Sequence, residues 1–236
     1  MATIAVYSLK GGVGKTTISV NLAYASATSG HRTLLWDLDP QGGATFLTGL
    51  NPRQSAHKIF AKDVPAENLI RTTAWDNLEV LPADASLRGL DRIFDKLGKK
   101  RRLAKLIAGL AKSYDRIILD CPPGLTETSE QVMHAADLIV VPVIPSPLSR
   151  RALDEVQLHL SHKLKATAEL LPVWSMVDRR RSLHRDIDNG WPCIPAASAV
   201  EQMAVRRMPL SAIAAKGAAQ DAFAALWRTI DARLAR

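Results

Sequence analysis

The sequence predicts an α/β fold, a single-domain, doubly wound and mostly parallel sheet with helices on both faces. Two observations predict it. Short apolar runs rich in β-branched residues alternate along the chain with segments of helical periodicity. A glycine-rich segment also joins the first apolar run to the first helical segment, at the end of a strand where open parallel sheets bind their ligands.

The expected strands are short, and several are apolar throughout, as is typical of parallel strands covered on both faces. They are residues 4–8, 33–36, 78–81, 116–119, 138–143 and 171–177. The expected helices are residues 16–29, 101–111, 128–135, 149–160 and 218–234. Residues 49–77 are the least regular, because two X-Pro pairs break any periodicity. No repeat or linker divides the chain, so residues 1–236 are expected to form a single domain.

Composition excludes several classes of protein. A chain of 236 residues with 47% hydrophobic positions can build a core without disulfides. Its two cysteines, Cys121 and Cys193, form no CxxC pair, which argues against a zinc site or a cysteine-ligated iron–sulfur cluster within one chain. No charged leader and no apolar run of about 20 residues is present, so a cytoplasmic protein without stable membrane insertion is expected.

The net charge of +8 favours polyanionic partners. Nucleic acid is the first candidate and an anionic membrane surface the second, while solubility alone is the simpler reading of the same excess.

The glycine-rich segment is typical of a phosphate-binding loop. It comprises Lys10, Gly11, Gly12, Val13, Gly14, Lys15, Thr16 and Thr17. Glycines allow successive backbone N–H groups to turn toward phosphate oxygens, and the following helix directs its positive end at the same anion. We expect Lys15 to reach the β- and γ-phosphates, the Thr16 hydroxyl to ligate Mg²⁺, and Thr17 to lie beside the α-phosphate. Leu9 occupies the first glycine position of the general P-loop pattern, so only a narrower pattern, KGGxGKT, is met.

Acidic residues follow two of the expected strands. Asp37 and Asp39 lie in the segment WDLDPQG, and Asp120 ends the apolar run of residues 117–119. Carboxylates at the carboxyl ends of parallel strands face the ligand-binding crevice, where Asp120 is expected to act as a Walker B acid. Without the other motifs, Asp37 and Asp39 would indicate a solvated turn, and Asp120 would indicate the N-cap of a helix.

Together these three segments resemble the ParA/MinD family of deviant Walker A ATPases, most closely the small ParA-type members without an N-terminal helix-turn-helix domain. The resemblance implies a weak, Mg²⁺-dependent ATP hydrolase that dimerises on binding ATP. It also implies that Lys10 crosses to the partner's nucleotide, that Asp39 positions the attacking water, and that Asp37 supports the Mg²⁺ shell. Asp178 and Pro209 match the adenine-side segments of the family.

The resemblance further implies partners. These are non-specific DNA and a ParB-like or adaptor protein, both stimulating hydrolysis, with a cargo (plasmid, chromosome or protein assembly) segregated or positioned on the nucleoid. Basic clusters occur at residues 99–102, 150–151, 179–185 and 206–207. Ala196 stands where the family often has arginine, so the expected DNA contacts shift to Arg179, Arg180, Arg181, Arg185, Arg206 and Arg207.

Two rival functions remain open at this stage. The first is a MinD-like, membrane-associated regulator of cell division, because Phe223, Leu226, Trp227, Ile230 and Leu234 follow helical spacing beside arginines. A helix that packs on the sheet produces the same pattern. The second is a DNA-coating scaffold that binds ATP without turning it over.

Overall fold

The computed structural model describes residues 1–51, 55–61, 64–97, 101–164, 166–187, 190–213 and 216–235. Lys99 and Lys100, which belong to the first basic cluster, lie outside this part of the chain.

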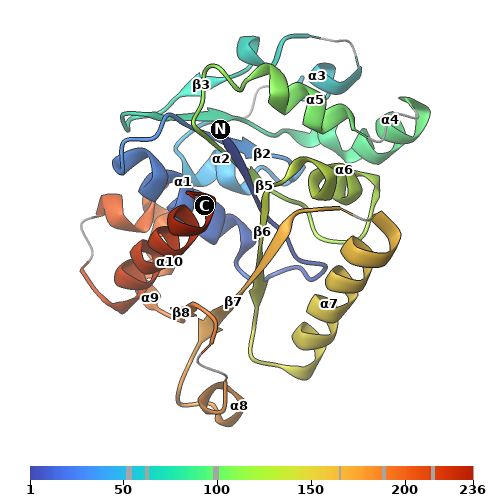
Figure 1. Ribbon diagram of the computed structural model, residues 1–236. Coiled ribbons are helices and arrows are strands. Elements are labelled where there is room, and N and C mark those ends of the chain that lie inside the picture. Colours follow the sequence, from blue (N-terminus) through green and yellow to red (C-terminus); the bar gives the residue numbers. More distant parts are fainter. Residues whose placement is uncertain are drawn as a thin grey trace.

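One eight-stranded sheet organises the chain, in the order β3-β4-β2-β5-β1-β6-β7-β8 (Figure 1). Its strands are β1 (Ala2–Val6), β2 (Thr33–Asp37), β3 (Arg71–Thr72), β4 (Leu78–Leu81), β5 (Arg116–Asp120), β6 (Leu138–Val143), β7 (Glu169–Val177) and β8 (Cys193–Pro195). All neighbouring pairs are parallel except β3–β4. The central strand β1 leads directly into the glycine-rich loop, so that loop leaves the middle of the sheet.

Helices cover both faces, which confirms the predicted fold class. The helices are α1 (Lys15–Thr28), α2 (Gly43–Leu47), α3 (Lys58–Ala61), α4 (Leu90–Leu97), α5 (Arg102–Gly109), α6 (Glu127–Ala135), α7 (Pro147–Leu158), α8 (Ser182–Arg185), α9 (Ser198–Arg206) and α10 (Ala218–Leu234). Single turns of other helix types lie at Ala66–Asn68, Ala85–Gly89, His159–Leu164 and Leu210–Ile213.

Two separate hydrophobic clusters form because side chains alternate along each strand. On β2, Leu34 and Trp36 belong to the cluster beneath α3 to α7, whereas Leu35 belongs to the cluster beneath α1, α2, α9 and α10. In Figure 1 these two sets of helices lie on opposite sides of the strands. The sheet is therefore buried on both faces, as its apolar strands predict.

The α10 helix settles one question left open by its sequence. Its apolar side chains Phe223, Leu226, Trp227 and Ile230 are at most 4% exposed, and the helix packs against α1 and β8. The interpretation as a core helix is confirmed, and the apolar face is not available to a membrane surface in this structure. In the described residues, no helix combines the length and the apolar character that a bilayer crossing requires.

A buried carboxylate holds the segment after β4. Asp84 accepts hydrogen bonds from the backbone N–H groups of Ser55 (2.9 Å), Ala56 (2.8 Å) and Ser86 (2.7 Å). The Asp84 side chain therefore connects the irregular region before α3 to the helical turn Ala85–Gly89, which follows Asp84 directly.

Candidate phosphate-binding site

The glycine-rich loop adopts a left-handed turn before α1. Gly12 and Gly14 have φ angles of +70° and +91°, and α1 begins at Lys15. A Cβ atom on Gly14 would lie 3.0 Å from Ser175 Oγ of β7. That hydroxyl is itself fixed, because it donates a 2.7 Å hydrogen bond to the carbonyl of Val13. Glycine is therefore required at position 14 both by its backbone angle and by the neighbouring strand.

The loop is also tied to the segment after β5. The Tyr7 hydroxyl, which is fully buried, donates a 2.9 Å hydrogen bond to the Gly124 carbonyl, and Gly124 N–H donates to the Leu9 carbonyl at 3.2 Å. Burial raises the pKa of Tyr7 to about 12, so the phenol is protonated and can donate at neutral pH. The substitution of the first P-loop glycine by Leu9 is thus compatible with an ordered loop.

Two lysines lie at the loop. Lys15 Nζ donates a 2.9 Å hydrogen bond to the Lys10 carbonyl and is 7% exposed, and burial lowers the pKa of its ammonium group. Lys10 Nζ points away from this turn and donates to Ser149 Oγ of α7 at 3.3 Å. Lys15 therefore lies within the loop, while Lys10 rests on a neighbouring helix.

Three acids meet at the carboxyl ends of β2 and β5. Asp37 and Asp120 are register partners and are both fully buried. Burial, together with the charge of Asp37, raises the pKa of Asp120 above its ordinary value, and burial also raises the pKa of Asp37. Asp39, two residues further along the chain, lines the cavity beside the loop, whereas Asp37 does not line it.

The Asp120 carboxylate has one oxygen that accepts from Ser19 Oγ (2.9 Å) and one, Oδ2, without a hydrogen-bond partner among the described residues. The Thr16 side chain lies beside the same carboxyl group. A buried oxygen of this kind is suited to a cation or to a water bound to one. In the described part of the chain, His, Cys, Asp and Glu nowhere form a group of three or more able to hold a metal alone, so a cation here would also need ligands from a phosphate or water.

A cavity of about 630 Å³ brings most of the expected residues together. It is lined by Gly11, Gly12, Gly14, Lys15, Thr16, Thr17, Asp39, Pro40, Gln41, Pro122, Pro123 and Met176. Its walls thus come from the loops that follow β1, β2 and β5 and from β7. Lys10 and Val13, which the sequence also placed in the loop, do not line this cavity, and the Val13 side chain is buried.

A smaller, mainly apolar cavity of about 210 Å³ adjoins Gly14 and Thr17. It continues between β7, β8 and α9, along Ile194, Pro195 and Val200. Asp178 and Pro209 line neither cavity: Asp178 binds Arg180 (2.8 Å), and Pro209 is buried. Sequence reasoning did not single out Met176, which has a φ angle of +55° and lies in both cavities.

The expected DNA-binding arginines fall into two groups. Arg179, Arg180, Arg181 and Arg185 are exposed around α8, which projects from the sheet at its β8 end (Figure 1). The guanidinium of Arg180 lowers the pKa of Asp178 to about 2, so this ion pair persists at neutral pH.

Arg206 and Arg207 lie at the end of α9. Arg206 is exposed, but Arg207 stacks on Phe46 (4.7 Å) and donates to the carbonyls of Phe46 and Leu50. Arg207 thus differs from the other five expected DNA-binding arginines, because its guanidinium is bound to residues of α2 and of the segment that follows it.

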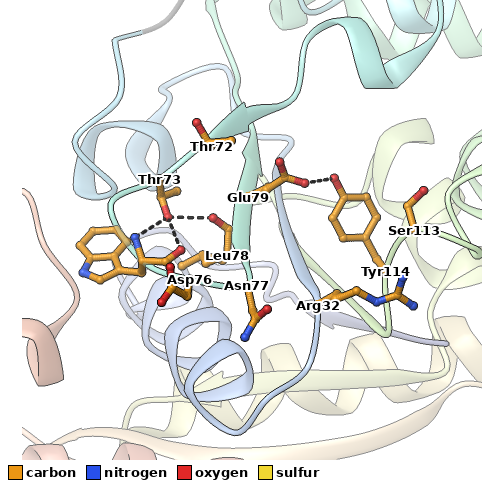
Figure 2. Close-up of a pocket in the computed structure, with 10 residues that line it drawn as sticks. Arg32, Thr72, Thr73, Asp76, Asn77, Leu78, Glu79, Ser113 and Tyr114 are labelled. Carbon is orange, nitrogen blue, oxygen red and sulfur yellow. Dashed lines mark hydrogen bonds between the residues drawn. The ribbon is translucent and has the colours of Figure 1, made fainter.

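A third cavity, of about 330 Å³, lies at the opposite end of the sheet, where β2, β4 and β5 begin (Figure 2). Several of its polar groups bind neighbouring protein groups: Tyr114 donates to Glu79 at 2.5 Å, Arg32 pairs with Asp115, and Thr73 donates to the Leu78 carbonyl. None of the site residues expected from the sequence lines this cavity.

Comparison with known proteins agrees with the site. The AAA_31 family model, described as an AAA domain, matches residues 1–169. The chain is 35% identical over 191 residues to the sporulation initiation inhibitor protein Soj of Bacillus subtilis, covering 76% of this chain and 74% of Soj. It is 30% identical over 200 residues to the chromosome partitioning protein ParA of Caulobacter vibrioides, covering 79% and 74%.

The fold is found in solved structures as well. The septum site-determining protein MinD complexed with Mg-ADP from Pyrococcus horikoshii is similar with a TM-score of 0.82 at 23% identity, covering 98% of this chain and 96% of that one. The family match, the two relatives and the glycine-rich loop between β1 and α1 lead to one conclusion: the chain belongs to the ParA/MinD family of P-loop ATPases.

Proposed function

We propose that residues 1–236 form a single ParA-type domain that binds and hydrolyses ATP, dimerises when ATP binds, and positions or segregates a cargo on DNA. One observation carries the proposal: Lys15, Thr16 and Asp39 line the same cavity at the end of the central strand. Relatives named as chromosome partitioning proteins support a role in segregation.

The residues divide the work of phosphoryl transfer, which is mostly positioning and charge stabilisation. The backbone N–H groups of residues 11–15 cradle the phosphates, and Lys15 neutralises charge on the β- and γ-phosphates. Asp39 orients the attacking water. Lys10 leaves Ser149 and reaches the nucleotide of the partner subunit, so that each site is complete only in a dimer.

A magnesium ion fits the acidic side of the cavity. Thr16 Oγ1 would hold it directly and Asp120 through a water molecule, while Asp37, on the adjacent strand, would support the Mg²⁺ shell. When bound, Mg²⁺ neutralises developing charge on the phosphate oxygens. The unpartnered Oδ2 of Asp120 supports this assignment. For the base, Asp178 and Pro209 stay predictions, and the apolar cavity beside Gly14 is a further candidate.

DNA binding is proposed to be non-specific and to act through phosphate contacts. The exposed arginines around α8, together with Arg206, support it because, within the described part of the chain, only Arg180 among them forms an ion pair, with the half-buried Asp178. Arg207 is the least suited of the set, because its donors are already engaged. A ParB-like or adaptor protein and DNA would stimulate the slow hydrolysis, in a cytoplasmic and nucleoid-associated setting.

The test is the oligomeric state measured by light scattering. With Mg²⁺ and a non-cleavable ATP analogue the chain should become a dimer, and with ADP it should not. Asp39→Ala should form a lasting dimer with ATP itself and remain on DNA, whereas Lys15→Ala should stay monomeric. A chain that stays monomeric with the analogue, or an Asp39→Ala variant that hydrolyses ATP at the unmodified rate, would overturn the proposal.

A further inference from the structure

Thr45 lies in α2, outside the cavity, and is fully buried. Its backbone N–H and its hydroxyl both donate to Asp37 Oδ2, each at 2.8 Å. Thr45 Oγ1 also accepts a 3.0 Å hydrogen bond from the N–H of Ala83, which follows β4. Because that bond occupies the acceptor side of the hydroxyl, its proton is directed to Asp37.

The other oxygen of Asp37 holds the segment that carries Asp39. Asp37 Oδ1 accepts from the Asp39 N–H at 3.1 Å, and Asp39 in turn accepts from the N–H groups of Gln41 (2.9 Å, at Oδ1) and Gly42 (2.8 Å, at its carbonyl). One buried carboxylate therefore connects both ends of the segment from β2 to α2. Its orientation decides where the Asp39 backbone lies.

The beginning of α2 also touches the expected cation ligand. A Cβ atom on Gly43 would lie 3.1 Å from Thr16 Cγ2 and 3.4 Å from its Oγ1. A shift of α2 would thus move against Thr16 and move Asp39 at the same time. Thr45 is the side chain that fixes α2 to the end of β2.

We infer that Thr45 is a positioning residue for hydrolysis: by donating to Asp37 it sets the orientation of that carboxylate and thereby places Asp39 against the phosphates. The inference rests on the proposed function for the role of Asp39. Thr45 itself does not line the cavity, so it acts through Asp37 and makes no contact with the nucleotide.

The experiment compares three variants. Thr45→Val keeps the shape and the backbone donor but removes the hydroxyl, and Thr45→Ser keeps the hydroxyl. Thr48→Val is the matched control, because Thr48 is buried (4% exposed) next to the end of the same helix, yet its hydroxyl donates to the carbonyls of Ala44 and Thr45. Should Thr45→Val not fold, Thr45→Cys, of similar size and with only a weak donor, replaces it.

Two readouts are taken. In the ATPase assay, Thr45→Val should lower kcat at least about tenfold, the loss expected for one hydrogen bond to a charged group, with KM nearly unchanged. Thr45→Ser should recover most of the rate and Thr48→Val should keep it. In hydrogen exchange of the free protein, the amides of Asp39, Gln41 and Gly42 should exchange about tenfold faster in Thr45→Val than in Thr48→Val.

Each outcome decides. An unchanged kcat in Thr45→Val, an equal loss in Thr48→Val, or no recovery in Thr45→Ser would overturn the inference. A parent protein that hydrolyses no ATP would instead count against the proposed function. The exchange rates would still judge Thr45 in that case: equal rates in the two valine variants would refute its positioning role.

Discussion

Replacing Gly14 by alanine probes the contact between the glycine-rich loop and β7. A φ angle of +91° costs an L-residue about 1–2 kcal/mol. The new Cβ would also lie 3.0 Å from Ser175 Oγ, so this hydroxyl has to shift, and the shift weakens its buried bond to the Val13 carbonyl, at a cost of up to about 1 kcal/mol. We therefore expect Gly14→Ala to lower the free energy of unfolding by about 2–3 kcal/mol, which is about 4–12 °C in Tm for a chain of this size.

The chain offers a matched control in Gly30. Its φ angle is +92°, but a Cβ there would meet no atom within 4 Å, so Gly30→Ala should cost only the backbone strain of about 1–2 kcal/mol. Adding Ser175→Ala to both backgrounds completes a double-mutant cycle, read by thermal and urea unfolding. We expect a favourable coupling of about 1 kcal/mol with Gly14→Ala and none with Gly30→Ala. Equal losses in the two glycine variants, or zero coupling with Ser175, would refute the steric reasoning.

Three further predictions concern charge. Lys15→Ala should reduce ATP affinity at least about 100-fold in calorimetric titration, because a buried cation at the phosphates is lost; an unchanged affinity would contradict its assignment. Replacing Arg179, Arg180 and Arg181 by alanine should weaken DNA binding and reduce the slope of log K against log salt by about 0.9 for each lost phosphate contact, and an identical slope would remove this cluster from the interface. Burial alone would raise the pKa of Asp84, but the hydrogen bonds from Ser86, Ala56 and Ser55 outweigh it, so the pKa lies below its ordinary value. The carboxylate therefore stabilises the fold above the unfolded-state pKa of about 3.9, and this contribution is lost as the pH falls through its lower folded-state pKa. Asp84→Ala should lower the free energy of unfolding by about 2 kcal/mol at pH 7. The difference in unfolding free energy between the variant and the parent should become smaller below about pH 4, and a difference independent of pH would be evidence against this account.

The regular core of the fold could be predicted because its signals are local. The predicted helix at residues 218–234 coincides with α10, and the strands at residues 78–81 and 138–143 coincide with β4 and β6. The first strand lies two residues earlier than predicted, at Ala2–Val6. Tyr7 and Ser8 are buried beyond its end, and the Tyr7 N–H still donates to the Val140 carbonyl of β6 at 3.0 Å. Strand β7 begins two residues earlier than predicted, and its residues 169–174 pair with β6.

The elements that the sequence did not predict are short or depend on distant contacts. β3 and β8 have two and three residues, too few for a period to show, and each is held by one neighbouring strand. Helix α9 (Ser198–Arg206) has a single fully buried side chain, Met203, with Ala199 and Val200 partly buried beside it, so its apolar pattern is short.

The site divides in the same way. The phosphate-binding loop and Asp39 are motif residues, and the structure brings them into one cavity. Two other placements depend on tertiary packing, which the spacing of residues along the sequence does not encode. Arg207 binds Phe46, about 160 positions away, and Asp37 binds Thr45 of α2 and does not line the cavity.

Two hydrogen bonds of Gly124, accepted from the Tyr7 hydroxyl and donated to the Leu9 carbonyl, have a thermodynamic consequence. They join the phosphate loop to the proline-containing loop after β5 in the ligand-free chain. The conformational entropy of both loops is therefore lost once, when the chain folds, and little remains to be lost at nucleotide capture. Weakening these two hydrogen bonds would keep every phosphate-binding group in the chain and still reduce the affinity for nucleotide, because the loops would be more disordered in the free protein.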